Sequence, residues 1–585
     1  MPLVARSVAV ALSFVLLSSP PALQIWVGGD TRPYILATIA LAVVNALLVL
    51  LWTRGSELSA PPAAALKGPP YESDGNYVLA VAVAGAAGWL IVTACRAWLH
   101  QILTIPHDPQ RADMLIVVQQ GLQRMLQGRN PYTIYRVPWD APLPYGPMLW
   151  APFAVPMLLH ADVRFLTVAG ELFVPAACAI AAVLSAARGH FAACAACLAM
   201  LAATCLNPDL ERFASIGHTP AYWPLLALLA WLVVRERWYG AAIVLGLLVV
   251  ARTTMVAMVP VLLMAVWWRE RAKFRGAVAL VALAAALPFL PFAIKDPRAL
   301  AYAMYGSYQN VIKGFVWTST TWTQHTIGLT GVLLSNGLQR FVDAFQALVM
   351  LLVYAAAWLA MRRGRPPVAW MGLALLAFSM TTLWPVTYVY FDVFLFLAAA
   401  VIGEIMTVPA GRAPSGPAAS VPAWWTATAA ATTLLVVVTA ALMLTDNPEI
   451  DAGAAAGRPF LRSGFAGDER EGDRSFAWVE GRHASVLLPR RSARATSIDI
   501  IGQPALASAS SVQQLTAVLN GMLVDTVVVP RGWNRISLNA PAPAWRIGIN
   551  ELELFLSSTA SPSDAGTGDD RRELSLAIDR VTVRP

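Results

Sequence analysis

The chain has 585 residues, a formal net charge of +8 and a mean hydropathy of +0.59. With 57% hydrophobic and only 13% charged residues, its composition excludes an ordinary soluble domain and indicates a protein built to sit in lipid. Because most Lys and Arg residues lie in short runs between apolar segments, the positive charge indicates cytoplasmic loops, and we expect no nucleic-acid partner.

The N-terminal apolar run is predicted to be a membrane helix. A cleaved signal would also begin with a basic residue such as Arg6, but the apolar residues continue beyond Pro20-Pro21 and a second apolar segment follows at 34–53. All 5 cysteines lie in apolar stretches, so neither a disulfide framework nor a zinc site is expected.

The hydropathy pattern predicts a polytopic α-helical membrane protein with about 13 crossings, since about 20 apolar residues span the hydrocarbon core. The basic loops at 235–237, 269–275 and 362–365 each follow an even number of crossings, which places them in the cytoplasm with Arg6. The expected crossings are 8–28, 34–53, 77–98, 163–186, 190–206, 219–234, 239–251, 254–268, 276–293, 342–361, 368–384, 386–406 and 423–444.

Segment 146–160 does not fit this count, because a further crossing there would invert every later loop. Its three prolines indicate irregular backbone, which is tolerated at membrane depth only where protein or a water-filled cavity covers it. We expect it to be re-entrant or interfacial. The alternative is that one N-terminal segment does not cross.

After Thr445 the sequence changes to short alternating strands separated by turn residues, which is typical of a β-sandwich. The odd number of crossings places this part outside. We therefore predict a membrane domain over 1–445 and an extracytoplasmic β-sandwich over 446–585. The clearest expected strands are 485–488, 497–500, 526–529, 535–538 and 551–555.

The first long outer loop is predicted to contain an amphipathic helix at 113–127, with an apolar face that includes Leu115, Val118 and Leu122. Such a helix lies flat on a membrane surface. Gly128 is expected to end it. Asp113 therefore stands at a helix start, at the depth of the lipid headgroups.

This loop resembles the GT-C superfamily of integral-membrane glycosyltransferases, in particular its polyprenyl-phosphate-mannose-dependent bacterial branch. That pattern is an Asp, about fifteen helical residues, G-x-N-P-Y and then Y-P-P. The chain has Asp113 and Gly128, followed by Asn130-Pro131-Tyr132, but departs from the pattern at Tyr145-Gly146-Pro147. Weaker echoes, at Ser215-Ile216-Gly217-His218, Arg252 and Trp384-Pro385-Val386-Thr387-Tyr388, extend the resemblance over roughly 77–406.

The resemblance implies transfer of a sugar from a polyprenyl phosphate, which needs a base for the acceptor hydroxyl and cations or donors for the phosphate. Asp113 is the expected general base. The expected donor- and phosphate-binding residues are Arg252, His218 and His325, and the expected sugar- or acceptor-binding residues are Asn130, Tyr132, Tyr145, Trp322 and Tyr388. No D-x-D motif occurs in the outer loops, so we expect no metal or other cofactor. A divalent cation held by acidic pairs, which some GT-C branches use, stays an open alternative.

Each of these residues also has a structural explanation. Asp113 could simply cap its helix, and Asp108 is its rival as base although two prolines flank it. The Arg252 side chain could instead reach along the helix to place its guanidinium at the membrane surface. His218 and His325 could be ordinary loop residues, and the tryptophans could belong to the interfacial aromatic belt.

The C-terminal part resembles jelly-roll, galactose-binding-like modules in its G-x-N-x-L-x-L strand from Gly548, which precedes an acidic and basic turn at 568–573 and a last strand. Such modules often bind carbohydrate on their loops. A docking or structural cap is the alternative.

Taken as a whole, the sequence predicts a multi-pass glycosyltransferase of the bacterial plasma membrane. It would move a mannose-like hexose or a pentose to an extracytoplasmic glycan or glycolipid acceptor, in contact with membrane lipids. The alternatives are a transporter or flippase for a lipid-linked glycan, which would carry ionisable residues within its helices, and a non-catalytic scaffold displaying a sugar-binding domain.

Overall fold

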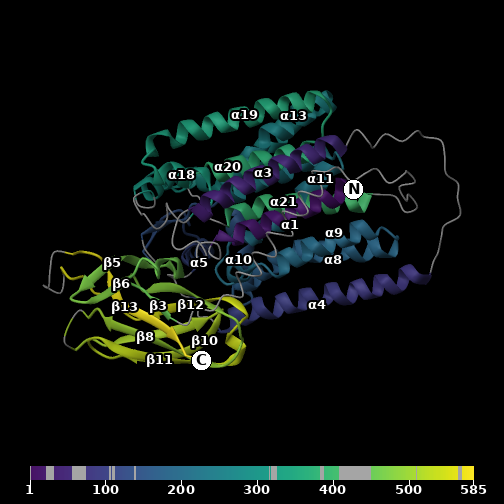
Figure 1. The fold of residues 1–585 in the computed structure, drawn as a ribbon. Coiled ribbons are helices and arrows are strands. Elements are labelled where there is room, and N and C mark those ends of the chain that lie inside the picture. The colour runs from purple at the N-terminus through teal and green to yellow at the C-terminus, as the bar shows by residue number, and fades with distance from the viewer. Residues whose placement is uncertain are drawn as a thin grey trace. The chain divides into compact units, whose positions relative to one another are not determined.

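The structure is a computed structural model of the full chain (Figure 1). It describes residues 2–20, 32–55, 74–104, 107, 112–136, 140–314, 317, 326–382, 388–407, 449–506, 508, 510–563 and 570–584. The chain folds into two compact units, one mainly helical and one that contains the C-terminal β-strands.

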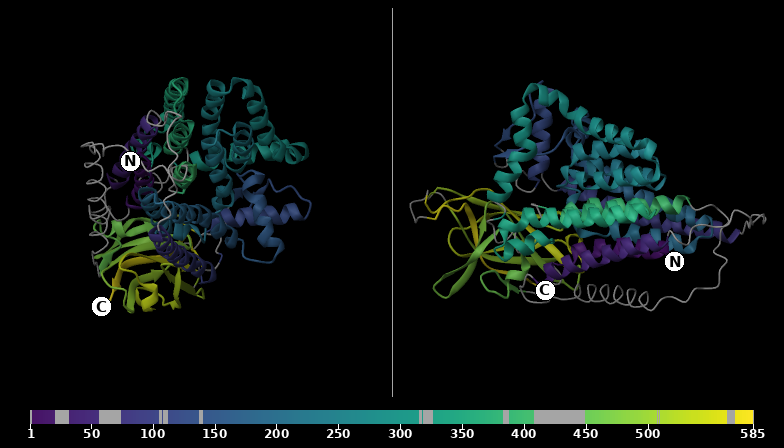
Figure 2. Two further views of the ribbon diagram at one scale, coloured as in Figure 1. Left: turned by 90° about the vertical axis from the view of Figure 1, so that its right-hand side faces the viewer. Right: turned by 90° about the horizontal axis from the view of Figure 1, so that it is seen from above.

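The helical unit is a bundle in which α1, α8, α9 and α21 run along a common direction, and the left view of Figure 2 shows several of its helices nearly end-on. Its main helices are α1 (Pro2–Ser18), α3 (Arg32–Gly55), α4 (Asp74–Thr104), α8 (Arg164–Ala187), α9 (Phe191–Cys205), α11 (Trp223–Val234), α12 (Trp238–Ala251), α13 (Val259–Arg269), α14 (Phe274–Ala286), α19 (Val342–Arg362), α20 (Pro367–Met380) and α21 (Val389–Thr407).

Among the described residues, 6 helical spans are long and apolar enough to cross a membrane by length and composition. They are Tyr34–Trp52, Tyr77–Leu103, Arg164–Ala187, Arg271–Lys295, Gln339–Arg362 and Val389–Met406. Other expected crossings correspond to apolar helices of 10–17 residues, and the expected crossing at 423–444 lies outside the described residues. The apolar helical unit is thus confirmed, while the number of thirteen crossings stays a prediction.

The three loops predicted to be cytoplasmic meet at one end of the helical unit. Arg269 forms an ion pair with Glu236 and donates from Nη2 to the backbone carbonyls of Gly364 at 3.3 Å and Arg365 at 3.2 Å. One arginine therefore joins all three basic loops. This agrees with the even spacing of the loops along the chain, because loops separated by an even number of crossings lie on the same side.

Helix α21 is the most buried of the long spans, because 89% of the segment Val389–Met406 is buried inside the structure. Near its C-terminal end Glu404 forms an ion pair with Arg6 of α1, and a Cβ at Gly403 would lie 3.7 Å from Val234, next to the first basic loop. Arg6 therefore belongs to the same end as the basic loops. Asp392, twelve residues earlier on α21, lies about 18 Å from Glu404 along the helix axis.

The predicted amphipathic helix is present as α5 (Asp113–Leu126), with Leu115, Val118 and Leu122 buried. Gly128 follows it with a φ of +72°, the left-handed conformation that commonly ends helices. Segment 146–160 forms α6 (Pro147–Trp150), the 3₁₀ turn η2 (Ala151–Phe153) and α7 (Ala154–Leu158). These pieces of 4, 3 and 5 residues are together shorter than a helix that crosses a bilayer.

The remaining helical elements are short connecting pieces between these helices. They are α10 (Pro208–Phe213), η3 (Thr219–Tyr222), η4 (Thr253–Met258), η5 (Arg271–Lys273), η6 (Leu287–Phe289), α15 (Leu290–Lys295), α16 (Pro297–Ala301), the π-helical turns η7 (Tyr302–Gly306) and η8 (Tyr308–Ile312), α18 (Leu329–Ser335) and η10 (Gln339–Phe341). Strands β1 (Ile134–Tyr135) and β2 (Ala141–Pro142) pair in the loop between α5 and α6.

The C-terminal part is a β-sandwich, as predicted, built from antiparallel sheets with the strand orders β10-β9-β12-β7-β4 and β11-β8-β13-β6-β5, and with β3 beside β13. All five of the clearest expected strands lie within observed strands. The strands are β3 (Glu449–Asp451), β4 (Leu461–Ser463), β5 (Phe465–Glu471), β6 (Arg474–Glu480), β7 (His483–Arg490), β8 (Thr496–Pro504), β9 (Gln513–Leu519), β10 (Met522–Val529), β11 (Asn534–Ala540), β12 (Gly548–Leu556) and β13 (Leu574–Val583).

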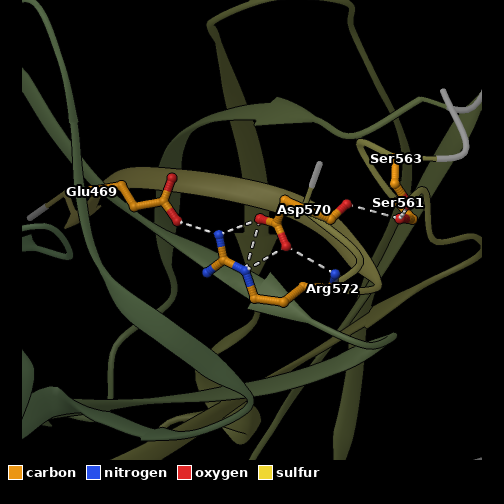
Figure 3. Close-up of polar contacts among 5 residues, drawn as sticks. All are labelled: Glu469, Ser561, Ser563, Asp570 and Arg572. Atoms are coloured by element: carbon orange, nitrogen blue, oxygen red, sulfur yellow. Dashed lines mark hydrogen bonds and ion pairs between the residues drawn. The ribbon is translucent and has the colours of Figure 1, made fainter. Parts of the chain in front are cut away.

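Alternate residues of the strands pack between the two sheets, for example Val486 and Leu488 of one sheet with Ile498 and Ile500 of the other. The described part of the predicted acidic and basic turn leads into β13. There Arg572 donates to Asp570 and, at 2.7 Å, to Glu469 of β5 (Figure 3). These three charged groups therefore satisfy one another.

The convergence of the basic loops can be tested by cysteine labelling in a variant whose native cysteines are replaced by alanine. Arg235→Cys and Arg363→Cys should react with a membrane-impermeant maleimide only after lysis, because both belong to the same end of the bundle. Arg129→Cys, in the first outer loop, should react in intact cells. Opposite accessibilities at Arg235 and Arg363 would contradict the arrangement.

Candidate functional site

A buried carboxylate on helix α21 organises the candidate site. The Asp392 side chain accepts hydrogen bonds from Tyr222 Oη at 2.7 Å, Trp223 Nε1 at 2.9 Å and Arg252 Nη1 at 3.1 Å. Asp392 is fully buried. Burying a charge is costly unless it is paired and hydrogen-bonded. Arg252 supplies the opposite charge, and all three residues donate hydrogen bonds to the carboxylate.

Arg252 lies at a break between helices. Helix α12 ends at Ala251, Arg252 is extended with a φ of −149°, and η4 begins at the next residue. Nη1 donates to both Tyr222 and Asp392, whereas Nε and Nη2 have no hydrogen-bond partner among the described residues. Arg252 is 9% exposed. The pairing rules out the alternative in which Arg252 simply extends to the membrane surface, and it leaves donors available to a ligand.

Aromatic rings surround this arginine. The Arg252 guanidinium lies 5.1 Å from the ring centroid of Tyr388, and the His218 ring lies 4.6 Å from that of Tyr145 and 5.9 Å from that of Tyr388. Tyr145, His218, Arg252 and Tyr388 therefore lie close together although they come from four distant segments, and their expected roles in binding stay predictions. We call these four residues and Asp392 the arginine cluster.

His218 is an unsatisfied member of the arginine cluster. It is 3% exposed, and its Nε2 atom is buried without a hydrogen-bond partner among the described residues. Burial and the nearby positive charge of Arg252 lower the pKa of His218 to about 3. The ring is therefore neutral at physiological pH, and Nε2 is a hydrogen-bonding atom that awaits a ligand or water.

Close backbone packing brings the start of α6 against α12, and α8 against η3, beside the cluster. A Cβ at Gly146 would lie 2.0 Å from the carbonyl oxygen of Val250, and one at Gly170 would lie 2.0 Å from that of Pro220. Thr167 also donates to the carbonyl of Gly217 at 2.7 Å, next to His218. The departure from Y-P-P at position 146 thus has a physical reason, because proline also carries a Cβ.

Asp113 lies near the cluster at the start of α5. It is partly exposed, and its carboxylate accepts a hydrogen bond from its neighbour Met114 at 2.6 Å. Ala112, not Asp113, occupies the N-cap position, and no side-chain cap bond is formed there. Burial raises the pKa of the Tyr145 phenol, and the negative charge of Asp113 makes a smaller contribution in the same direction.

Asn130 and Tyr132 support the loop that carries Tyr145. The Asn130 side chain accepts from the backbone N–H of Tyr132 at 3.1 Å, and the buried Tyr132 hydroxyl donates to the carbonyl of Tyr145 at 3.3 Å. The Tyr132 ring packs edge-on against Phe292. These contacts explain both residues structurally, and their expected role in sugar binding stays a prediction.

Three of the sequence-based candidates, Asp108, Trp322 and His325, lie outside the described residues. Within the part of the chain that the structure describes, no group of three or more His, Cys, Asp or Glu side chains is arranged to hold a metal ion.

The sequence analysis missed the acidic side chains within the helices. Asp392 and Glu404 stand in an apolar segment that was treated only as a crossing, and Glu171 stands in α8 with both carboxylate oxygens buried and without a partner among the described residues. An ionisable residue within an apolar span is itself a signal of function. That signal would have identified Asp392, but not its partners.

No protein-family model matches this chain, and no curated protein matches it. A solved structure, described as a family 35 carbohydrate-binding module from an environmental isolate, aligns over 22% of this chain and 91% of its own length, at 18% sequence identity and a TM-score of 0.16. At this TM-score we base no conclusion on the likeness.

The Arg252–Asp392 pair can be tested by separate and combined substitution. Asp392→Leu should destabilise the protein by about 3–5 kcal/mol, because it leaves the Arg252 charge buried without its counter-ion. Combining it with Arg252→Met should recover most of that loss in a thermal unfolding assay in detergent. Additive losses in the double variant would contradict the pairing.

The neutral state of His218 predicts a specific pH dependence. Because its pKa is about 3 when folded and about 6.5 when unfolded, the unfolded chain binds more protons between these values, so stability falls as pH drops below about 6.5. His218→Gln should reduce this slope in thermal unfolding measured from pH 7.5 to 4. The partly exposed His190→Gln is the matched control. An unchanged slope in His218→Gln would contradict the prediction.

Proposed function

We propose that the protein is a membrane glycosyltransferase that moves a sugar from a polyprenyl-phosphate donor to an extracytoplasmic glycan or lipid acceptor. The supporting observation is the arginine cluster, in which a paired arginine with two unused donor atoms lies beside a neutral, unsatisfied histidine. Such donors suit a phosphate oxygen. We favour this function over the alternatives from the sequence because it requires both a phosphate site and a base. In this proposal Arg252 and His218 form the phosphate site and Asp113 is the base.

In this proposal the leaving phosphate is held by Arg252 and His218. The acceptor oxygen attacks the anomeric carbon, the bond from that carbon to the phosphate oxygen breaks, and Asp113 takes the proton from the acceptor hydroxyl. The phosphate leaves with one more negative charge, which the guanidinium stabilises. Asp392, Tyr222 and Trp223 hold Arg252 in position, and displacement from the opposite face inverts the anomeric carbon.

The cluster also agrees with the proposed orientation. Asp392 lies about 18 Å along α21 from Glu404, and Glu404 pairs with Arg6 at the end where the basic loops meet. If that end is cytoplasmic, the arginine cluster lies towards the extracytoplasmic side, where a polyprenyl-linked donor would present its sugar. The proposed reaction would then take place at the outer side of the plasma membrane, where an extracytoplasmic acceptor is present.

The central experiment is Asp113→Asn, assayed with a labelled polyprenyl-phosphate mannose and a glycan acceptor. Loss of a general base should reduce turnover by about 10²–10⁴-fold, because an amide does not accept the proton at neutral pH. Asp108→Asn is the matched control and should retain activity. Near-normal turnover by a monodisperse Asp113→Asn protein would exclude Asp113 as the base.

Transport of a lipid-linked glycan is a second candidate, and Glu171 favours it. Its buried carboxyl lies in a span of 24 residues, and such groups often mark substrate pathways. Proteoliposomes loaded with a fluorescent polyprenyl-phosphate sugar distinguish the two functions. Movement of the lipid between leaflets without sugar transfer, abolished by Glu171→Gln, would favour the transporter.

A further inference from the structure

The outer face of the six-stranded sheet carries an unusual set of charged and aromatic side chains. Ile498 and Ile500 of β8 face the core, so the intervening Asp499 faces outwards. On β13 the register shifts between Ile578 and Arg580, which is typical of a β-bulge. This places Asp579 and Arg580 together on the outer face.

A hollow of about 240 Å³ lies on this face. It is smaller than the roughly 300–1,000 Å³ of pockets that enclose a drug-sized ligand, so it suits one small unit of a longer ligand. Its lining comes from β3, β8, β11, β13 and the residues after β13. The lining residues are Glu449, Asp499, Ile501, Arg535, Arg580, Thr582 and Arg584.

The charges of the hollow favour an anion. The carboxylate of Asp499, only 6% exposed, is shared by Arg584 and, at 3.8 Å, by Arg535. Ser537 donates to it at 2.6 Å. Two guanidiniums thus face one carboxylate, and an arginine carries five N–H donors in a fork that matches a second carboxylate. Arg535 is 59% exposed, so it is free to move towards a ligand.

Arg580 adds a donor that the fold leaves unused. Its Nη1 forms an ion pair with Glu449 at 2.8 Å, whereas its Nε is buried without a hydrogen-bond partner among the described residues. Glu449 and Asp499 line the same hollow, and carboxylate oxygens are acceptors for hydroxyl groups. The site therefore combines donors for a carboxylate with acceptors for hydroxyl groups.

Aromatic rings lie next to the hollow. Trp533 precedes Arg535 by two residues, in the bend that leads into β11. Its ring lies 5.3 Å from that of Phe476 and 4.6 Å from the guanidinium of Arg474, and Trp478 packs edge-on against Phe476. Trp533 and Trp478 are partly exposed. A partly exposed tryptophan combines an apolar ring with a polar N–H edge, which suits the C–H face of a sugar ring.

We propose that this outer face binds an acidic glycan, whose sugar rings stack on Trp533 and whose carboxylate is bound by Arg535, Arg580 and Arg584. The site differs from the loop position expected from the sequence, where Asp570, Arg572 and Glu469 already satisfy one another (Figure 3). A phosphate group fits less well, because its second negative charge adds repulsion from Glu449 and Asp499 that a singly charged carboxylate does not meet. The inference does not depend on glycosyl transfer.

The test is calorimetric titration of the full chain in detergent with trigalacturonate, and with neutral maltotriose for comparison. We expect trigalacturonate to bind and maltotriose to bind at least tenfold more weakly. Arg535→Ala should weaken trigalacturonate binding about ten- to a hundredfold, the range for loss of a charge-assisted hydrogen bond. Raising the salt concentration should also weaken it.

Arg494→Ala is the matched control, because Arg494 is exposed and is not among the residues that line the hollow. Trp533→Ala should also weaken binding, with unfolding of the β-sandwich followed by circular dichroism to exclude misfolding. Asp113→Asn should bind trigalacturonate as the unmodified protein does, which separates this site from the proposed transferase site. Absence of trigalacturonate binding, equal binding of maltotriose, or undiminished binding by a folded Arg535→Ala would each overturn the proposal.

Discussion

The structure of the helical unit depends on a carboxylate placed inside an apolar helix. Asp392 cannot remain charged and buried unless donors reach it, and the donors come from Tyr222 and Trp223 at the start of α11 and from Arg252 after α12. One side chain therefore fixes how these segments meet. Arg252 itself stands at a break of the helix, where its extended backbone separates α12 from η4.

This pairing also prepares the site for a ligand. Because Arg252 is held through Nη1 by Tyr222 and Asp392, its remaining N–H donors keep a fixed direction. The neutral ring of His218 adds Nε2, which has no hydrogen-bond partner among the described residues. Glycines at 146 and 170 let their segments approach the backbones of Val250 and Pro220 closely enough to complete the cluster. Stability and binding are thus linked, since the ion pair that stabilises the bundle also orients the group proposed to hold phosphate.

Part of this arrangement could be predicted from sequence, because it depends on local periodicity. The 3.6-residue pattern predicted α5 at its observed start, the two-residue alternation predicted strands of the sandwich, and the basic loops predicted a shared end. Contacts between distant segments could not be predicted from such patterns. Asp392 and Tyr222 are 170 positions apart, and Gly146 meets Val250 only in the folded chain. For the same reason the aromatic and charged face of the six-stranded sheet was not expected.

The central claim is that the arginine cluster binds the phosphate of a polyprenyl-linked donor. Electron cryo-microscopy of the full chain with bound polyprenyl phosphate tests it most directly. We predict phosphate density within hydrogen-bonding distance of the unused donors of Arg252 and of His218 Nε2, with Asp113 facing the space where the sugar would lie. A phosphate bound elsewhere, with the cluster closed or filled only by water, would contradict the account.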